Sequence, residues 1–225
     1  MNLTKKQVFK ISPSSLNLMK EYPRCFWLDK HNVRKRPSGI FPSLPSGMDR
    51  ILKIHFDKFM GKNELPPELK ESECIDGCKL YDDKENLKLW RNNFKGIQYY
   101  DEEGNTLFGA VDNILVKYGK LIVLDYKTRG FDLKEDTADN YQNQLDVHNY
   151  LLNKAGYEIE DYAYLLFYIP EKVLESGEVV FTNHLIKRRI FQKNAETLFK
   201  NTIHLLNNDC PDKTCEWCRG IQYEN

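Results

Sequence analysis

The sequence predicts an α/β fold in which a mixed central β-sheet is flanked by helices. Two apolar runs, residues 107–116 and 121–128, flank a short turn at residues 117–120, which is the pattern of a β-hairpin. After this hairpin, helical and strand-like patterns alternate along the chain. Such alternation is typical of a sheet covered by helices, and it is the basis of the predicted fold class.

The chain before the hairpin is predicted to combine helices with irregular segments. Ser12 and the residues after it, Pro13–Ser15, are typical of a helix start, and this short helix is predicted to end near Pro23. Between this helix and the hairpin we expect a loop over residues 36–47, a helix over 49–60 that Gly61 ends, an irregular polar segment over 63–83 and a short helix over 87–94.

The chain after the hairpin is predicted to hold two helices and two strands. Thr137 is expected to cap a helix that runs to Ala155, where Gly156 ends it. The apolar and aromatic run over residues 162–169 predicts a buried strand. A further strand over 179–190 and a final helix over 192–207 complete the predicted elements.

The composition excludes some classes of protein. No run approaches the roughly eighteen apolar residues that a membrane-spanning helix needs, so we expect no membrane association. The N-terminal residues lack the apolar core of a signal peptide, and we therefore expect a cytoplasmic protein. The 33 basic residues balance 33 acidic residues. Any binding of nucleic acid must therefore come from local patches rather than from the overall charge.

Two basic stretches near aromatic residues are candidates for such a patch. Cations interleaved with aromatic rings suit contact with a nucleic-acid backbone and stacking on its bases. Solvated charge runs without a ligand are the alternative. The candidate residues are Arg34, Lys35 and Arg36 in the first stretch, and Arg188 and Arg189 in the second.

The predicted hairpin carries the charged residues that point to chemistry. If Tyr118-Gly119 forms a two-residue loop, Asp112 lies directly opposite Asp125 on the same face of the sheet. Lys127 points to that face too, because side chains alternate along a strand. Two carboxylates this close repel each other unless a cation lies between them, and Mg²⁺ or Mn²⁺ suits such oxygen ligands. The alternative is a buried acid–lysine pair beside an exposed acid.

These residues resemble a known family of nucleases. The segments Gly109–Asp112 and Asp125–Thr128, followed by Gln144 in a helix, are similar to the PD-(D/E)XK nuclease superfamily, and most similar to its RecB-like branch. That branch includes AddB, the CRISPR adaptation nucleases and phage exonucleases. The resemblance runs from Ile11 to the cysteines that follow Asp209. It implies a restriction-endonuclease-like core.

The resemblance also implies an activity and a role for each matched residue. It implies a metal-dependent DNA nuclease, either an exonuclease or an end-processing enzyme of repair or recombination. Asp112 and Asp125 would bind Mg²⁺ or Mn²⁺, Lys127 would assist the attacking water, and Gln144 would position substrate or lysine. His148 stands where the family usually has a tyrosine. A polar stripe on an amphipathic helix is the alternative for Gln144 and His148.

A third metal ligand is expected on the helix before the hairpin, because the resembling nucleases place a histidine or an acid there. Asp49 and His55 are the candidates. They are six residues apart and so point to different faces of a helix, which means that only one can serve. The position of Asp49 shortly after Gly47 favours Asp49, although the RecB-like branch uses histidine.

The six cysteines are the second group that points to metal. In a cytosolic enzyme, grouped cysteines suggest metal ligands rather than disulfides. The resemblance implies a 4Fe–4S cluster that joins the two ends of the nuclease domain, and zinc or free thiols are the alternatives. The close pair Cys74 and Cys78 is interpreted as incidental. The ligands implied are Cys25, Cys210, Cys215 and Cys218.

The resemblance suggests a single nuclease domain over residues 1–225. It would hold a helical part over 1–60, a catalytic core over 105–190 and a cysteine cluster over 208–220. The expected partners are single- or double-stranded DNA ends and a helicase or another replication or recombination protein. The alternative function is a catalytically inactive module of the same fold that binds nucleic acid, or a metal–sulfur protein that binds another protein.

Overall fold

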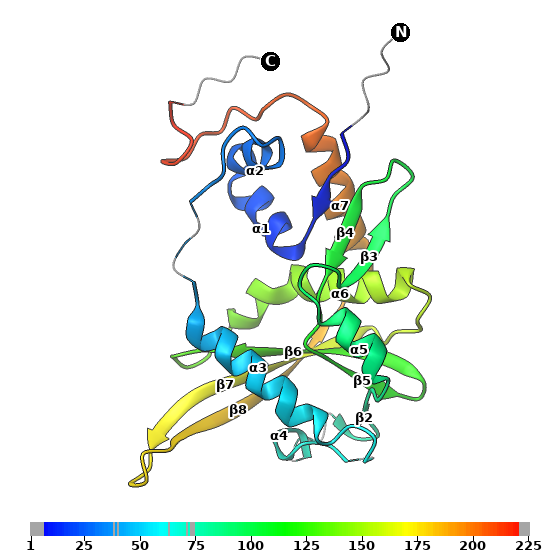
Figure 1. Ribbon diagram of the computed structural model, residues 1–225, viewed down its shortest axis with the longest axis vertical. Helices are drawn as coiled ribbons and strands as arrows, with labels where there is room; N and C mark the ends of the chain where they lie inside the picture. The colour runs from blue at the N-terminus through cyan, green and yellow to red at the C-terminus, as the bar shows by residue number, and fades with distance from the viewer. Residues whose placement is uncertain are drawn as a thin grey trace.

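A computed structural model describes residues 7–37, 39, 41–62, 64–70, 72 and 75–220. The protein is a mixed α/β structure with two β-sheets flanked by helices (Figure 1), which confirms the predicted α/β class. The elements in chain order are β1 (Lys10–Ile11), α1 (Pro13–Glu21), α2 (Pro23–Lys30), α3 (Ser43–Asp57), α4 (Pro67–Lys70), β2 (Lys79–Leu80), α5 (Lys84–Trp90), β3 (Ile97–Tyr100), β4 (Thr106–Gly109), β5 (Asn113–Lys117), β6 (Lys120–Thr128), the 3-10 helix η2 (Thr137–Tyr141), α6 (Gln142–Lys154), β7 (Tyr162–Val173), β8 (Val179–Arg189) and α7 (Gln192–Leu206).

The larger sheet has the strand order β2-β5-β6-β7-β8, and the smaller sheet has the order β1-β4-β3. Within the larger sheet β6 and β7 run parallel, while the other neighbours are antiparallel. Helix α6 lies between the two sheets (Figure 1) and contacts β3 and β4 on one side and β6 on another. All eight residues from Leu145 to Leu152 are buried. Helix α6 is therefore not an exposed amphipathic helix with a polar stripe.

The hairpin prediction is right over β5 and β6 and wrong before β5. The pairing runs from Asn113 opposite Leu124 to Lys117 opposite Lys120, around the predicted two-residue loop. Tyr118 and Gly119 both have positive φ, as a tight two-residue turn requires. The first apolar run, however, breaks after Gly109, and its first half forms β4 in the other sheet.

The break has a physical cause in a helix earlier in the chain. The Arg91 side chain donates from Nε to the carbonyl oxygen of Asp112 at 2.7 Å, and Val111 N donates to Trp90 O at 3.2 Å. These bonds hold residues 110–112 out of both sheets. A continuous hairpin would place Ala110 opposite Lys127, but the ladder between β5 and β6 ends at the pair Asn113 and Leu124. The partner of Lys127 in the sheet is Phe167 of β7, on the other side of β6.

Several element boundaries also differ from the sequence prediction. Helix α3 begins at Ser43, so the predicted loop over 36–47 is wrong in its last part; Pro45 falls in the first turn, where proline is tolerated. Helix α2 begins at Pro23, where the sequence predicts only an end. Thr137 does not cap a helix: it starts η2, and its hydroxyl accepts a hydrogen bond from Lys134 N at 2.9 Å.

Helix α4 and strand β2 lie in the segment 63–83, which was wrongly predicted to be irregular, and β3 was not predicted. Helices α1, α5 and α7 agree with their predictions to within a few residues. Helix α1 is capped by Ser12, whose hydroxyl accepts from Ser15 N at 3.2 Å. Strands β7 and β8 and helix α7 lie where the apolar patterns predict them, with β7 longer than expected at its C-terminal end. Among the described helices, none has both the length and the apolar character needed to cross a bilayer.

Candidate active site and thiol cluster

Strand β6 carries the centre of the first site, because Asp125 and Lys127 share one face of this strand. Asp125 is 1% exposed, and its Oδ2 contacts the Lys127 ammonium. Its other oxygen, Oδ1, accepts a hydrogen bond from Gln144 Nε2 at 3.0 Å. Lys127 Nζ in turn donates to Gln144 Oε1 at 3.2 Å. Gln144 on α6 therefore holds both the acid and the lysine of β6 in a closed ring of contacts.

Asp112 joins this group from the break before β5. Its Oδ2 accepts a hydrogen bond from the backbone N–H of Tyr126 at 2.9 Å, which places the carboxylate next to Asp125. Burial, opposed by Lys127 and assisted by repulsion from Asp112, raises the pKa of Asp125 to about 7. Burial alone would raise the pKa of Asp112, but the attraction of Lys53 and Lys127 outweighs this effect, so its pKa falls below the ordinary value. We call Asp112, Asp125, Lys127 and Gln144 the carboxylate–lysine site.

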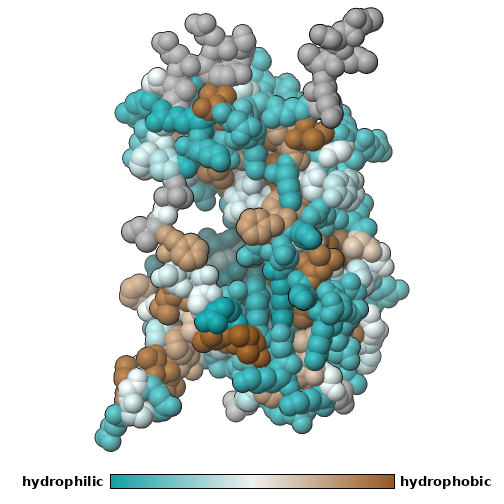
Figure 2. All heavy atoms as spheres, viewed as in Figure 1, coloured by the Kyte–Doolittle hydropathy of each residue, from teal (hydrophilic) through white to brown (hydrophobic). Residues whose placement is uncertain are grey.

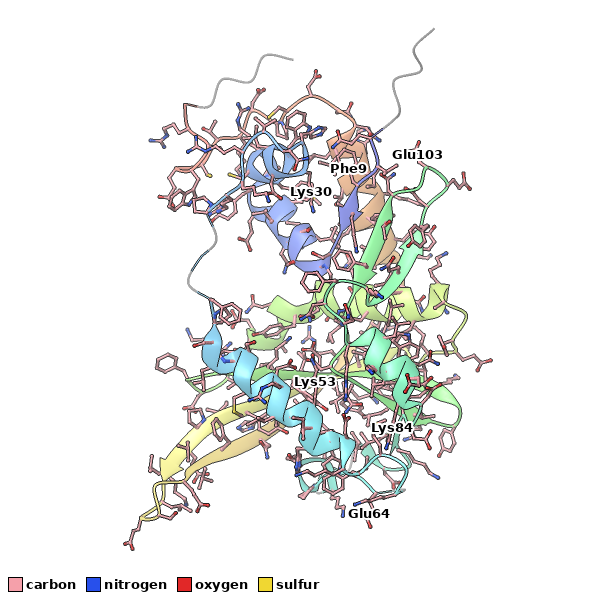
Figure 3. All side chains as sticks on the ribbon, in the orientation of Figure 1. Phe9, Lys30, Lys53, Glu64, Lys84 and Glu103 are labelled. Carbon is pink, nitrogen blue, oxygen red and sulfur yellow. The ribbon has the colours of Figure 1, made fainter. Side chains whose placement is uncertain are left out.

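Helix α3 adds a third carboxylate to the site. Lys53 Nζ lies 2.8 Å from Asp49 Oδ1 and 3.0 Å from Asp112 Oδ1, and so links the two acids. Figure 3 labels Lys53 on α3, where this helix passes across the larger sheet. Burial and the nearby Asp112 raise the pKa of Asp49. Of the two candidates for a third ligand, Asp49 is thus the one that lies at the site.

His55, the alternative third ligand, lies elsewhere. Its Nε2 is 3.0 Å from Glu68 Oε1, and its ring packs edge-on against Phe59. Because Asp49 and His55 are on different faces of α3, the helix cannot present both to the sheet. The structure therefore separates the two candidates as their spacing predicts.

His148 lies on α6, and its ring is buried against the end of β4. It is 1% exposed, and its Nδ1 has no hydrogen-bond partner among the residues that the structure describes. Burial, opposed by Asp112, lowers the pKa of His148 to about 4, so the imidazole is neutral at pH 7. A Cβ at Gly109 would lie 2.8 Å from His148 Cδ2, which explains why this position has no side chain. The close packing of Gly109 on His148 fixes the start of the break that carries Asp112.

A cavity of about 460 Å³ opens beside Gln144 and His148. Ser12, Ser14 and Asn17 at and near the start of α1 also line it. In the same view as Figure 1, Figure 2 shows a hollow between the part of the molecule that holds α1 and the part that holds α3. Polar side chains therefore face a space next to the carboxylate–lysine site.

Three thiols form a second group, which we call the thiol cluster. Cys25 Sγ lies 3.2 Å from Cys215 Sγ, and Cys218 Sγ lies 3.7 Å from Cys215 Sγ. All three sulfur atoms lie within 4.8 Å of one another, and such a group could hold a metal ion. Burial and the neighbouring thiols raise the pKa of Cys25 to about 12. For Cys215, burial is outweighed by hydrogen bonds from Cys25 and nearby backbone, and its pKa falls to about 7.

Contacts between α2 and the C-terminal segment build the thiol cluster. Trp27 Nε1 donates to Asn208 O at 2.9 Å, and the Arg24 guanidinium donates to Pro211 O at 2.8 Å. These bonds bring Cys25 to two cysteines about 190 residues later in the chain.

Cys210 and Cys78 stand apart from this group. Cys210 is half-buried, and its Sγ lies 4.0 Å from Pro211 O, outside the set of three close thiols. Cys78 is buried in the core away from the cluster, and Cys74 lies outside the described residues. The structure thus brings together three of the four predicted cluster ligands.

The two basic stretches differ in how many of their cations are exposed. Arg34, Lys35 and Arg189 are exposed. Arg36 lies 3.7 Å from the centre of the Tyr22 ring, and Arg188 pairs with Asp139 at 2.6 Å. Arg34, Lys35 and Arg36 also line a small pocket beside Cys25 and Cys218, so the first stretch adjoins the thiol cluster.

Two residues at the site were not predicted from the sequence. Lys53 was not predicted, although its spacing of four residues after Asp49 places the two side chains on one face of α3. Arg91 was not predicted either, and its role depends on a bond to a backbone carbonyl that no pattern in the sequence reveals.

Comparison with known proteins does not assign the chain to a family. No protein-family model matches it, and no curated protein matches it. A solved structure entitled "Crystal structure of SSO0001" is similar to this chain with a TM-score of 0.43 and 17% sequence identity. The similarity covers 89% of this chain and 78% of that chain. Similarity at this level says nothing about function.

Proposed function

We propose that this protein is a metal-dependent nuclease that hydrolyses phosphodiester bonds at DNA ends, on a restriction-endonuclease-like core. The observation that carries the proposal is the ring of contacts among Asp125, Lys127 and Gln144, with the Asp112 carboxylate beside it. Two buried carboxylates next to an ammonium cost free energy, and a fold keeps such groups together where chemistry requires them.

The residues present fit Mg²⁺ or Mn²⁺. Asp112 and Asp125 offer hard oxygen ligands on one side of the site, and Asp49 offers a third carboxylate. Burial and the nearby Asp112 raise the pKa of Asp125, so its ionised form is costly at this site, and Asp49, Asp112 and Asp125 when ionised carry one more charge than Lys53 and Lys127. A divalent cation held by these acids would balance it. When bound, it supplies an activated water and stabilises charge on a phosphoryl oxygen.

The protein groups have separate tasks in this proposal. Lys127, held by Gln144 Oε1 and by Asp125, presents its ammonium to the attacking water and to the charge that develops on the phosphate. Gln144 positions Lys127, because its amide bonds both partners of the pair. The low exposure of Asp125 and Lys127 keeps bulk water away from these charges, which strengthens their effect.

The substrate strand is proposed to lie in the cavity beside Gln144 and His148. Ser12, Ser14 and Asn17, which also line this cavity, are neutral hydrogen-bonding groups of the kind that contact phosphate and sugar. The exposed Arg34, Lys35 and Arg189 are candidates for backbone contacts farther from the site.

The nuclease proposal is tested with end-labelled DNA. Linear single-stranded and double-stranded DNA, and circular single-stranded DNA, are incubated with Mn²⁺, Mg²⁺ or EDTA, and RNA of matching sequence serves for comparison. We expect cleavage of linear DNA that requires metal, and little cleavage of the circle because it has no ends. Binding of DNA without cleavage in every metal would contradict the nuclease proposal and support an inactive nucleic-acid-binding module.

The thiol cluster is proposed to hold a 4Fe–4S cluster, with Cys210 as the fourth ligand. The close sulfur atoms of Cys25, Cys215 and Cys218 support metal binding but suit zinc as well. The same observation is what favours the second candidate function, a metal–sulfur protein that binds a partner protein. That candidate predicts metal on the thiols and none on the aspartates.

Cys25→Ser is expected to remove the metal of the thiol cluster, because a hydroxyl is a poor ligand for iron or zinc compared with a thiolate. The measurement is iron, acid-labile sulfide and zinc per chain in protein purified without oxygen. Cys78→Ser is the matched control, since Cys78 is a buried thiol outside the cluster. Zinc without sulfide in the wild type would rule out the iron–sulfur assignment, and equal metal content in both variants would rule out the site.

A further inference from the structure

Lys53 of α3 forms ion pairs with both Asp49 and Asp112, and the mechanism proposed above gives it no role. Its Nζ lies 2.8 Å from both carboxylate oxygens of Asp49 and 3.0 Å from Asp112 Oδ1. An ammonium has three N–H donors and no acceptor, so these three oxygens match its full donor capacity. The side chain is only 19% exposed, which limits screening of these charges by solvent.

The contacts of Lys53 are those that a second metal ion would make. In two-metal sites the ions lie about 3.5–4 Å apart, and acidic side chains bind both of them. Here one oxygen of Asp112 contacts Lys53, and the other accepts from Tyr126 N. Each carboxylate oxygen still has a second lone-pair position, so Asp112 can bind one cation between itself and Asp125.

The net charge of the site also favours a single divalent cation. Asp49, Asp112 and Asp125 contribute three negative charges when ionised, and Lys53 and Lys127 contribute two positive charges. One divalent cation is enough to offset the remaining negative charge. A second divalent cation beside Lys53 would meet an ammonium already bound to both of its ligands, and like charges at that distance repel.

We propose that Lys53 takes the place of a second divalent cation between Asp49 and Asp112, so that this nuclease works with one metal ion. This inference rests on the proposed function, because it assumes that Asp112 and Asp125 bind metal. Lys53 is a positioning residue in this scheme: it holds Asp49 and Asp112 in place and supplies a permanent positive charge. Asp49 and Lys53 are four residues apart on α3 and so lie on the same face of the helix, which holds the Lys53 ammonium next to Asp49.

The test counts the Mn²⁺ ions bound per chain, from the electron paramagnetic resonance signal of free Mn²⁺ during a titration. We expect one ion for the wild type and two for Lys53→Met, because the position between Asp49 and Asp112 that Lys53 fills is then open to a second ion, apart from the position between Asp112 and Asp125. Lys58→Met is the matched control, since Lys58 is exposed at the end of the same helix, and one ion is expected. Asp125→Ala measures binding elsewhere in the protein, the thiol cluster included.

The outcomes separate this inference from the proposed function. Two ions in the wild type, or the same number in the wild type and Lys53→Met, would overturn the role of Lys53 and leave the nuclease proposal standing. Equal binding by the wild type and Asp125→Ala would overturn both proposals. If Lys53→Met does not fold, Lys53→Gln removes the charge and keeps a donor for Asp49, and it is expected to bind two ions. The wild-type count alone also decides against the inference if it is two.

Discussion

Replacing Lys127 by methionine is expected to lower the rate of DNA cleavage by about 10²–10³-fold while Mn²⁺ still binds, the loss that is typical when one preorganised charge is removed from an active site. Lys127 Nζ contacts Asp125 Oδ2 and donates to Gln144 Oε1 at 3.2 Å. It also lies 4.7 Å from the centre of the Tyr141 ring, so three groups fix its position. Methionine fills a similar volume without the charge.

The expected effect is on the chemical step rather than on metal binding. The ligands in our proposal are the carboxylates, and removal of a neighbouring ammonium leaves their negative charge less balanced. Mn²⁺ affinity should therefore stay the same or rise. The measurement combines single-turnover cleavage rates with a Mn²⁺ titration of the same preparations.

Lys120→Met is the matched control, because Lys120 lies at the start of the same strand with its side chain 44% exposed. Its cleavage rate should equal that of the wild type. If Lys127→Met cleaves as fast as Lys120→Met, Lys127 is only a structural partner of Asp125 and the proposed catalytic role is wrong.

Replacing Asp125 by asparagine is expected to change how stability depends on pH. Burial, with the repulsion of Asp112 and against the attraction of Lys127, raises the pKa of Asp125 from 3.8 to about 7. A folded-state pKa above the unfolded value means that the folded protein binds this proton more tightly. The contribution of Asp125 to stability is therefore fully present below about pH 4 and is lost as the pH rises through 7.

The asparagine side chain does not titrate, so the variant lacks this loss. The free energy of unfolding of Asp125→Asn, relative to the wild type, should rise from pH 4 to pH 7 and stay level above it. A shift of about three pH units at 1.36 kcal/mol each sets an upper limit of about 4 kcal/mol on the rise. His148, whose pKa is lowered by burial, titrates in both proteins and cancels in the difference.

The measurement is urea unfolding of both proteins between pH 4 and pH 8, with EDTA present to remove divalent cations. Glu135→Gln, which replaces an exposed acid by its amide, serves as the control for the substitution itself. A stability difference that is constant over this range would mean that Asp125 stays ionised beside Lys127 throughout. The raised pKa of Asp125, on which this prediction depends, would then be wrong.

Local patterns in the sequence were sufficient for the elements whose causes are local. Ser12 caps α1 through a bond to a residue three positions later, and the two-residue loop at Tyr118-Gly119 sets the pairing of β5 with β6. Each of these features depends on neighbours along the chain, and the periodicity of α7 does so too. For that reason a pattern of a few residues was enough to predict them.

The break between β4 and β5 could not be predicted, because the run Leu107–Val116 has the apolar pattern of one strand throughout. Bonds from Trp90 and Arg91, about twenty residues earlier, compete with the strand ladder and hold residues 110–112 apart. The same break turns the Asp112 carboxylate toward Tyr126 N. The opposition of Asp112 and Asp125 was thus expected from a continuous hairpin, whereas in the structure it depends on a bend.

The sequence by itself determined the α/β class, the β5–β6 register and the residue types of the site, since these depend on local periodicity, turn chemistry and composition. Only the tertiary structure decided between Asp49 and His55, added Lys53 to the carboxylates and joined Cys25 to Cys215 and Cys218. These choices depend on how α3 packs on β6 and how α2 meets the C-terminal segment. Contacts between segments far apart in the chain leave no periodic pattern in the sequence, so they could be identified only in the folded protein.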